Sequence, residues 1–122
     1  MLGKPVFVEP TLPSGRKYTR VACQWNGRVQ NTKRQIMPVT VRNISLGGVG
    51  IACSVAMKKG EKVLFECKAI NGEIRCDLKA ICVVAFVVLK VPDYEVGLQF
   101  HSDIEKYRDF IAGLVNARML GM

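Results

Sequence analysis

The sequence has little histidine, no long apolar run and no paired cysteine motif. Its one histidine is His101, so a Ser/His/Asp or Cys/His catalytic set would depend on that single side chain. The chain has an unbroken apolar run from Ile81 to Leu89, which is far shorter than the ~20 residues that a membrane-spanning helix needs. Met1 to Pro13 lacks the basic and apolar regions of a signal peptide. We therefore expect a cytoplasmic protein with no transmembrane segment and no enzymatic activity.

The cysteines argue against a disulfide framework and against a metal site. There are 5 of them, an odd number, and no CxxC pair occurs among them. Each lies in an apolar or alternating stretch, where cysteine behaves as a small core residue. We expect no catalytic residue, no metal and no resident cofactor.

Acidic residues are missing from a long part of the chain. Pro10 to Gly60 contains no Asp or Glu, although the formal net charge of the whole chain is +8. The bases in that stretch are Arg16, Lys17, Arg20, Arg28, Lys33, Arg34, Arg42, Lys58 and Lys59. Such a basic half indicates either an anionic partner (phosphate, nucleic acid or a membrane surface) or simply a solvated basic face.

A chain of 122 residues with 49% apolar and 23% charged residues is typical of one folded domain. Residues 1–15 are rich in proline and glycine, which predicts a flexible N-terminal segment. The domain itself is expected over residues 16–122.

Alternation of apolar and polar residues predicts a mainly all-β fold of short antiparallel strands, a small barrel or sandwich. Strands are expected over Thr19–Trp25, up to Asn43, over Val49–Cys53, on both sides of Asn71-Gly72, through the apolar run and over Val96–Phe100. Turns are expected at Asn26-Gly27, Lys59-Gly60-Glu61, Asn71-Gly72 and Pro92-Asp93.

One helix is expected at the end of the chain, over about residues 102–120. Ser102 to Glu105 matches a capping box. The apolar residues Ile104, Tyr107, Ile111, Leu114 and Val115 then recur at helical spacing. This stripe predicts packing on the barrel or on a partner.

Two short motifs lie in the basic half. Arg16 to Arg20 has the form RxxxR, and Asn43 to Gly48 has the form [D/N]xSxxG. The first precedes a predicted strand and the second leaves another. Glu95 to Phe100 then stands before the helix.

In these motifs and their order the chain resembles the PilZ domain, the bacterial receptor module for cyclic di-GMP. The resemblance covers Arg16 to the final helix. It implies a six-stranded antiparallel β-barrel with a C-terminal helix, in which the RxxxR segment is a loop that closes over ligand bound on the barrel. It also implies that Arg16, Arg20, Asn43, Ser45 and Gly48 contact cyclic di-GMP.

The chemistry of these residue types suits such a ligand. A guanidinium can pair with phosphate or with the O6/N7 edge of guanine and can stack on a base. Asn43 stands where the family more often has Asp, so it keeps an acceptor and loses a charge. Gly15 stands where some members have a further arginine, which favours one ligand per chain over two.

Other functions stay open at this level. A small basic barrel could bind RNA or single-stranded DNA, but this needs exposed aromatic residues for stacking, and the basic half has only Tyr18 and Trp25. A ligand-blind PilZ-like scaffold in pilus assembly is a further alternative. The leading hypothesis is a receptor that regulates a partner protein in motility, pili, exopolysaccharide synthesis or virulence.

Overall fold

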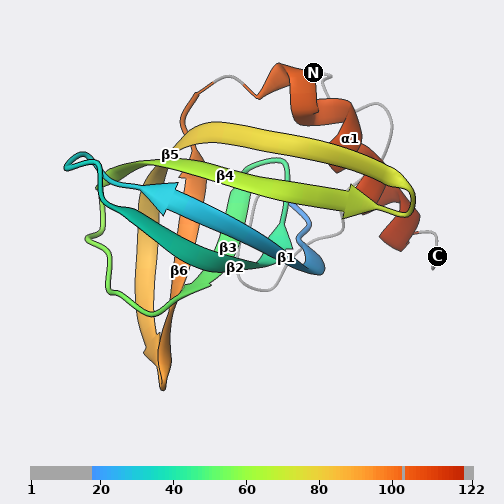
Figure 1. Cartoon of the computed structure of the whole chain (residues 1–122). Helices are drawn as coiled ribbons and strands as arrows, with labels where there is room; N and C mark the ends of the chain where they lie inside the picture. The colour runs from blue at the N-terminus through green and yellow to red at the C-terminus, as the bar shows by residue number, and fades with distance from the viewer. Residues whose placement is uncertain (1–17, 103, 120–122) are drawn as a thin grey trace.

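Six antiparallel strands close into a barrel, and one helix follows them (Figure 1). The computed structural model describes residues 18–102 and 104–119. The elements are β1 (Val21–Gln30), β2 (Ile36–Ile44), β3 (Gly48–Cys53), β4 (Lys62–Asn71), β5 (Ile74–Lys90), β6 (Asp93–Phe100) and α1 (Glu105–Met119). Around the barrel the strands follow the order β1-β2-β3-β6-β5-β4, and β4 pairs with β1 to complete the ring. The expected mainly β fold, a six-stranded barrel with a C-terminal helix, is confirmed.

The core is built from the inward-facing residues of each strand, as the alternating pattern predicts. Each strand has a fully buried residue: Val29, Val41, Ile51, Phe65, Cys82 and Val96. Every strand thus contributes apolar area to a single interior, which is the main source of the free energy of folding.

The helix packs against the barrel (Figure 1), where it contacts β1 and β5, and its predicted apolar stripe is buried. The Tyr107 hydroxyl of the helix accepts a hydrogen bond from the Lys79 amide of β5 at 3.2 Å. Ser102, which precedes the helix, accepts through its hydroxyl from the Ile81 amide of β5 at 3.0 Å. Within the two described stretches, no helix combines the length and apolarity required to span a bilayer.

The predicted turn at Asn26-Gly27 is wrong. Strand β1 continues through both residues to Gln30, and Gly27 pairs with Val39 on one side and Cys67 on the other. A Cβ at Gly27 would lie 2.8 Å from the Glu66 carbonyl oxygen. The glycine therefore permits close approach of β4. The turn prediction failed because glycine after asparagine can also lie inside a strand, where it allows such an approach.

The real turn between β1 and β2 comes five residues later. The Asn31 side-chain oxygen accepts hydrogen bonds from the amides of Lys33 and Gln35, each at 2.9 Å. Arg34 has a positive φ of 64°, a conformation that local bonds of this kind help to hold. Lys33 and Arg34 thus lie in an exposed hairpin loop.

The apolar run becomes part of one long strand. β5 has 17 residues; its first part pairs with β4 up to Val83, and its second part pairs with β6 from Cys82 to Lys90. Figure 1 shows the end of the β5–β6 ribbon projecting below the barrel. The hairpin predicted at Asn71-Gly72 is confirmed, with Gly72 at a φ of +64°.

All five cysteines are free thiols. Burial raises the pKa of both Cys67 and Cys82 to about 12, so neither forms the reactive thiolate near neutral pH.

We expect these two thiols to resist a disulfide reagent at pH 8 in the folded protein and to react quickly after denaturation. Reagent labelling followed by peptide mass spectrometry tests this, and rapid native labelling of Cys82 would contradict it.

Candidate functional site

A row of directly paired residues crosses the outer face of the barrel. Ala22 on β1 pairs with Asn43 on β2, Asn43 with Gly50 on β3, Gly50 with Gly97 on β6, and Gly97 with Phe86 on β5. The neighbouring pairs Ile44–Val49 and Val49–Leu98 bury their side chains inside the barrel. Because successive residues of a strand alternate between faces, the row points outward.

The two central glycines let larger neighbours lie flat on the barrel wall. A Cβ at Gly97 would lie 2.1 Å from the Phe86 ring, and a Cβ at Gly50 would lie 2.6 Å from the Asn43 amide nitrogen. Phe86 therefore covers Gly97, and Asn43 covers Gly50. A side chain at either glycine would displace the residue that covers it.

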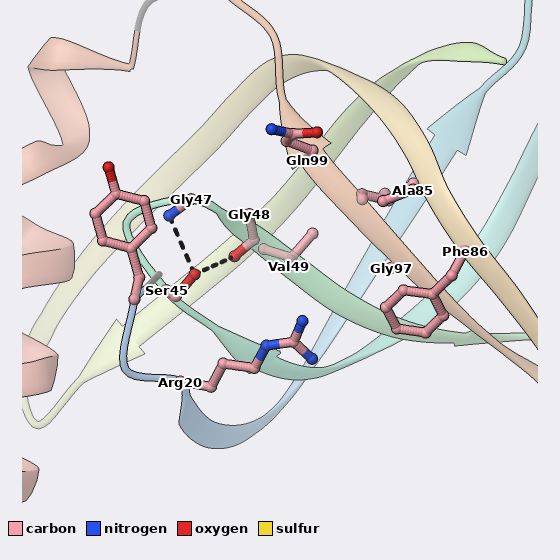
Figure 2. Close-up of a pocket in the computed structure, with 11 residues that line it drawn as sticks. Arg20, Ser45, Gly47, Gly48, Val49, Ala85, Phe86, Gly97 and Gln99 are labelled. Atoms are coloured by element: carbon pink, nitrogen blue, oxygen red, sulfur yellow. Dashed lines mark hydrogen bonds between the residues drawn. The ribbon is translucent and has the colours of Figure 1, made fainter. Parts of the chain in front are cut away.

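Arg20 stands over the Phe86 ring, with its guanidinium carbon 6.0 Å from the ring centroid. This is a cation–π distance, and it favours a fixed position for the arginine. In Figure 2 the Arg20 side chain reaches from the start of β1 toward the middle of the site, between Ser45 and Phe86.

Two cavities meet at Arg20 and Phe86. The first, of about 250 Å³, we call the loop pocket; it is lined by Tyr18, Arg20, Ser45, Gly47, Gly48, Val49, Ala85, Phe86, Gly97, Leu98 and Gln99 (Figure 2). The second, of about 330 Å³, we call the Asn43 pocket; it is lined by Arg20, Ala22, Arg42, Asn43, Phe86 and Glu95.

The turn between β2 and β3 forms one wall of the loop pocket. The buried Ser45 hydroxyl accepts a hydrogen bond from the Gly47 amide at 3.1 Å and donates to the Gly48 carbonyl at 3.5 Å (Figure 2). The Ser45 amide donates to the same carbonyl at 2.9 Å. Serine thus closes the turn that brings β3 back beside β2.

Both glycines of this turn are required by close contacts. A Cβ at Gly47 would lie 2.7 Å from the Tyr18 ring, and one at Gly48 would lie 2.0 Å from the Leu98 carbonyl oxygen. The serine and the glycines of the [D/N]xSxxG motif therefore have a structural role as well as a place in a pocket wall.

The residues expected from the motifs gather here, with one outside the described part of the chain. Arg20, Ser45 and Gly48 line the loop pocket, and Asn43 lines the adjoining one. Arg16, Gly15 and the N-terminal segment 1–15 lie outside the described residues. The geometry is that of a basic surface site with two compartments, suited to an anionic ligand with more than one part.

Phe86, Gly97 and Glu95 belong to the site but were not predicted from the sequence. Phe86 is hidden in the uniform apolar run, where nothing distinguishes an outward-facing residue. Its position follows only from the register of β5 on β6, which shifts between Val84 and Phe86. A β-bulge of this kind has no reliable sequence signal.

The comparisons with known proteins agree with this fold. The family model described as PilZ domain matches residues 14–117. A search of curated protein sequences found no match.

Solved structures with the same fold share little sequence with this chain. The inhibitor of motility MotI/DgrA of Bacillus subtilis has a TM-score of 0.73 and 14% identity over 85% of this chain. The PilZ domain of YcgR from Escherichia coli, solved with c-di-GMP, has a TM-score of 0.65 and 14% identity over 84% of this chain. The MrkH–c-di-GMP complex of K. pneumonia has a TM-score of 0.67 and 13% identity over 87% of this chain.

These proteins differ in how much of their own length is matched. The chain covers 93% of the isolated YcgR domain. It spans only about half of the other two, 51% of MotI/DgrA and 53% of MrkH.

Proposed function

This chain belongs to the PilZ domain family, and from that premise we propose that it is a cyclic di-GMP receptor whose ligand lies across the loop pocket and the Asn43 pocket. It acts as a binding module without catalytic activity. The solved domain of YcgR and MrkH, which share the fold, are both c-di-GMP complexes. That ligand has two phosphates and two guanines, which suits a basic site with two compartments.

The observation that carries the proposal is the position of Arg20. It lines both cavities and stands on the Phe86 ring between them. A guanidinium in that place can donate to a phosphate oxygen and present its flat face to a base at the same time. Asn43, Ser45 and Gly48 supply polar groups and close backbone approach on either side of it.

Regulation in this proposal comes from the segment that carries Arg16. In this proposal Arg16 also contacts the ligand, and folding of its segment over bound ligand creates a new surface for a partner protein in the cytoplasm. Ordering of chain around an anionic ligand is a common form of molecular switch. Motility, pili, exopolysaccharide synthesis and virulence are all processes that such a partner serves.

Calorimetric titration with cyclic di-GMP tests the proposed function directly. We expect saturable binding near one ligand per chain, because Gly15 offers no side chain for a second ligand. GTP and a short single-stranded oligonucleotide serve as control ligands and are expected to bind much more weakly. Tight oligonucleotide binding without binding of the dinucleotide would instead support a nucleic-acid-binding barrel.

Ser45→Ala is expected to weaken binding several-fold and to lower the free energy of unfolding by about 1 kcal/mol, the typical value of a lost hydrogen bond. The effect arises because the Gly47 amide loses its acceptor and the turn loosens. Ser54→Ala is the matched control, since Ser54 is exposed and lines neither pocket. Calorimetry and thermal unfolding measure both effects, and equal behaviour of the two variants would contradict the assignment.

A further inference from the structure

The Asn43 pocket contains a carboxylate, which is unexpected in a site for an anion. Glu95 lies on β6, two residues before Gly97, so both residues face outward. Its side chain is 39% exposed and lines the pocket together with Arg20 and Arg42. A negative group at the edge of an anion site weakens binding unless it meets a hydrogen-bond donor of the ligand.

Strand β3 separates Glu95 from Asn43. Strand β3 lies between β2 and β6 and contributes Gly50, opposite Asn43, and Ala52, opposite Glu95. Strands in a sheet are about 4.8 Å apart, so β2 and β6 stand about 10 Å apart across β3. The Asn43 side chain lies over Gly50, and the pocket has Asn43 and Glu95 in its wall together with the Phe86 ring. A flat aromatic base in this pocket therefore meets polar side chains at its edges.

Glu95 is only loosely held where it is. The Glu95 carboxylate forms an ion pair with the Lys90 ammonium at 3.3 Å, and the Lys90 side chain is 66% exposed. Exposed pairs of this kind contribute little to stability. The carboxylate can therefore turn to a ligand at small cost.

The donor pattern of the base decides which ligand suits a carboxylate. Guanine presents two adjacent donors on its Watson–Crick edge, N1–H and the N2 amino group, and a carboxylate presents two acceptors. Adenine presents a donor next to an acceptor, N6 amino and N1, so a carboxylate would face the N1 lone pair. A side-chain amide, with one acceptor and one donor, suits adenine instead.

Building on the proposed function, we propose that Glu95 determines base specificity: its carboxylate accepts hydrogen bonds from N1–H and N2–H of a guanine that lies in the Asn43 pocket. Arg20 and Arg42 then contact the phosphates and the face of the base, and Glu95 binds the edge of the base. The site thereby distinguishes cyclic di-GMP from cyclic di-AMP, which has the same phosphates and a different base edge.

The test compares cyclic di-GMP and cyclic di-AMP by calorimetry on the full chain and on Glu95→Gln. The unchanged protein is expected to prefer cyclic di-GMP. Loss of a charge-assisted hydrogen-bond pair should weaken cyclic di-GMP binding by roughly tenfold to a hundredfold, and the introduced amide should leave cyclic di-AMP binding equal or stronger. The ratio of the two affinities therefore falls, because cyclic di-GMP binds more weakly and cyclic di-AMP binds equally well or better.

Glu66→Gln is the matched control, because Glu66 also bears a surface ion pair, with Arg28 at 2.9 Å, and lines neither of the two pockets. Glu95→Ala is a second variant, since glutamine retains one acceptor. If the unchanged protein binds cyclic di-GMP and both Glu95 variants keep its affinity and its preference, the role of Glu95 is overturned while the proposed function stands. If the unchanged protein does not bind cyclic di-GMP, both are overturned.

Discussion

Replacement of Arg20 by alanine is expected to remove most of the affinity for cyclic di-GMP. The guanidinium lines both pockets, and loss of a charged, bidentate contact should cost about 1.5–3 kcal/mol, roughly tenfold to a hundredfold in the dissociation constant. Folding should change little, because a partly exposed cation–π contact contributes about 0.5–1 kcal/mol. Calorimetry and thermal unfolding of the variant measure the two quantities separately.

Arg75→Ala is the control for net charge. Arg75 is exposed on β5 and lines neither pocket, yet its loss lowers the formal charge by the same amount. Because general electrostatic attraction follows net charge, both variants would lose affinity equally if the basic surface alone attracted the ligand. Wild-type affinity in Arg20→Ala would show that the ligand does not lie at this site.

The second large effect is expected at Gly48. An alanine Cβ there would lie 2.0 Å from the Leu98 carbonyl oxygen and 3.1 Å from the Gln99 Cα. Both atoms belong to the backbone of β6, which pairs with β3, so neither can move without disturbing that ladder. Overpacking of this kind costs about 1–3 kcal/mol or more. Gly48→Ala should therefore lower the melting temperature and also weaken ligand binding.

Gly113→Ala is the control, and its expected effect on the melting temperature is opposite to that of Gly48→Ala. Gly113 lies within α1, and the atom nearest to an added Cβ is the Asn71 amide nitrogen at 3.9 Å. Alanine in a helix is favoured over glycine by about 0.5–1 kcal/mol, so this variant should melt higher than the unchanged protein. A melting temperature for Gly48→Ala equal to that of the unchanged protein would mean that β3 and β6 pack less closely at Gly48 than the structure shows.

The sequence predicted the barrel and the helix well because their signals are periodic. Val63, Phe65 and Cys67 recur at every second position, and the same residues are buried. The helix stripe from Ile104 to Val115 is buried as its spacing predicts. Periodic patterns report which side of an element meets the core, and the core dominates the energetics.

The site was only partly predictable for the opposite reason. Arg20 belongs to one local motif, and Ser45 and Gly48 belong to another. Phe86 and Glu95 instead reach the pockets through pairing between strands far apart in the chain. Their contribution depends on register and on the bulge near Phe86, which no short pattern encodes. The error at Gly27 has a similar origin, because its neighbours Glu66 and Cys67 come from a distant strand.

The row from Ala22 to Phe86 joins five of the six strands side by side. A ligand held across that row loses its site when any of these pairings opens, so it binds the closed barrel and not the unfolded chain. At a concentration a hundredfold above its dissociation constant, such a ligand adds about 2.7 kcal/mol to the stability of the fold. Under the proposed function, a rise in cyclic di-GMP would then also slow proteolysis of this chain, because proteases cleave the opened or unfolded protein.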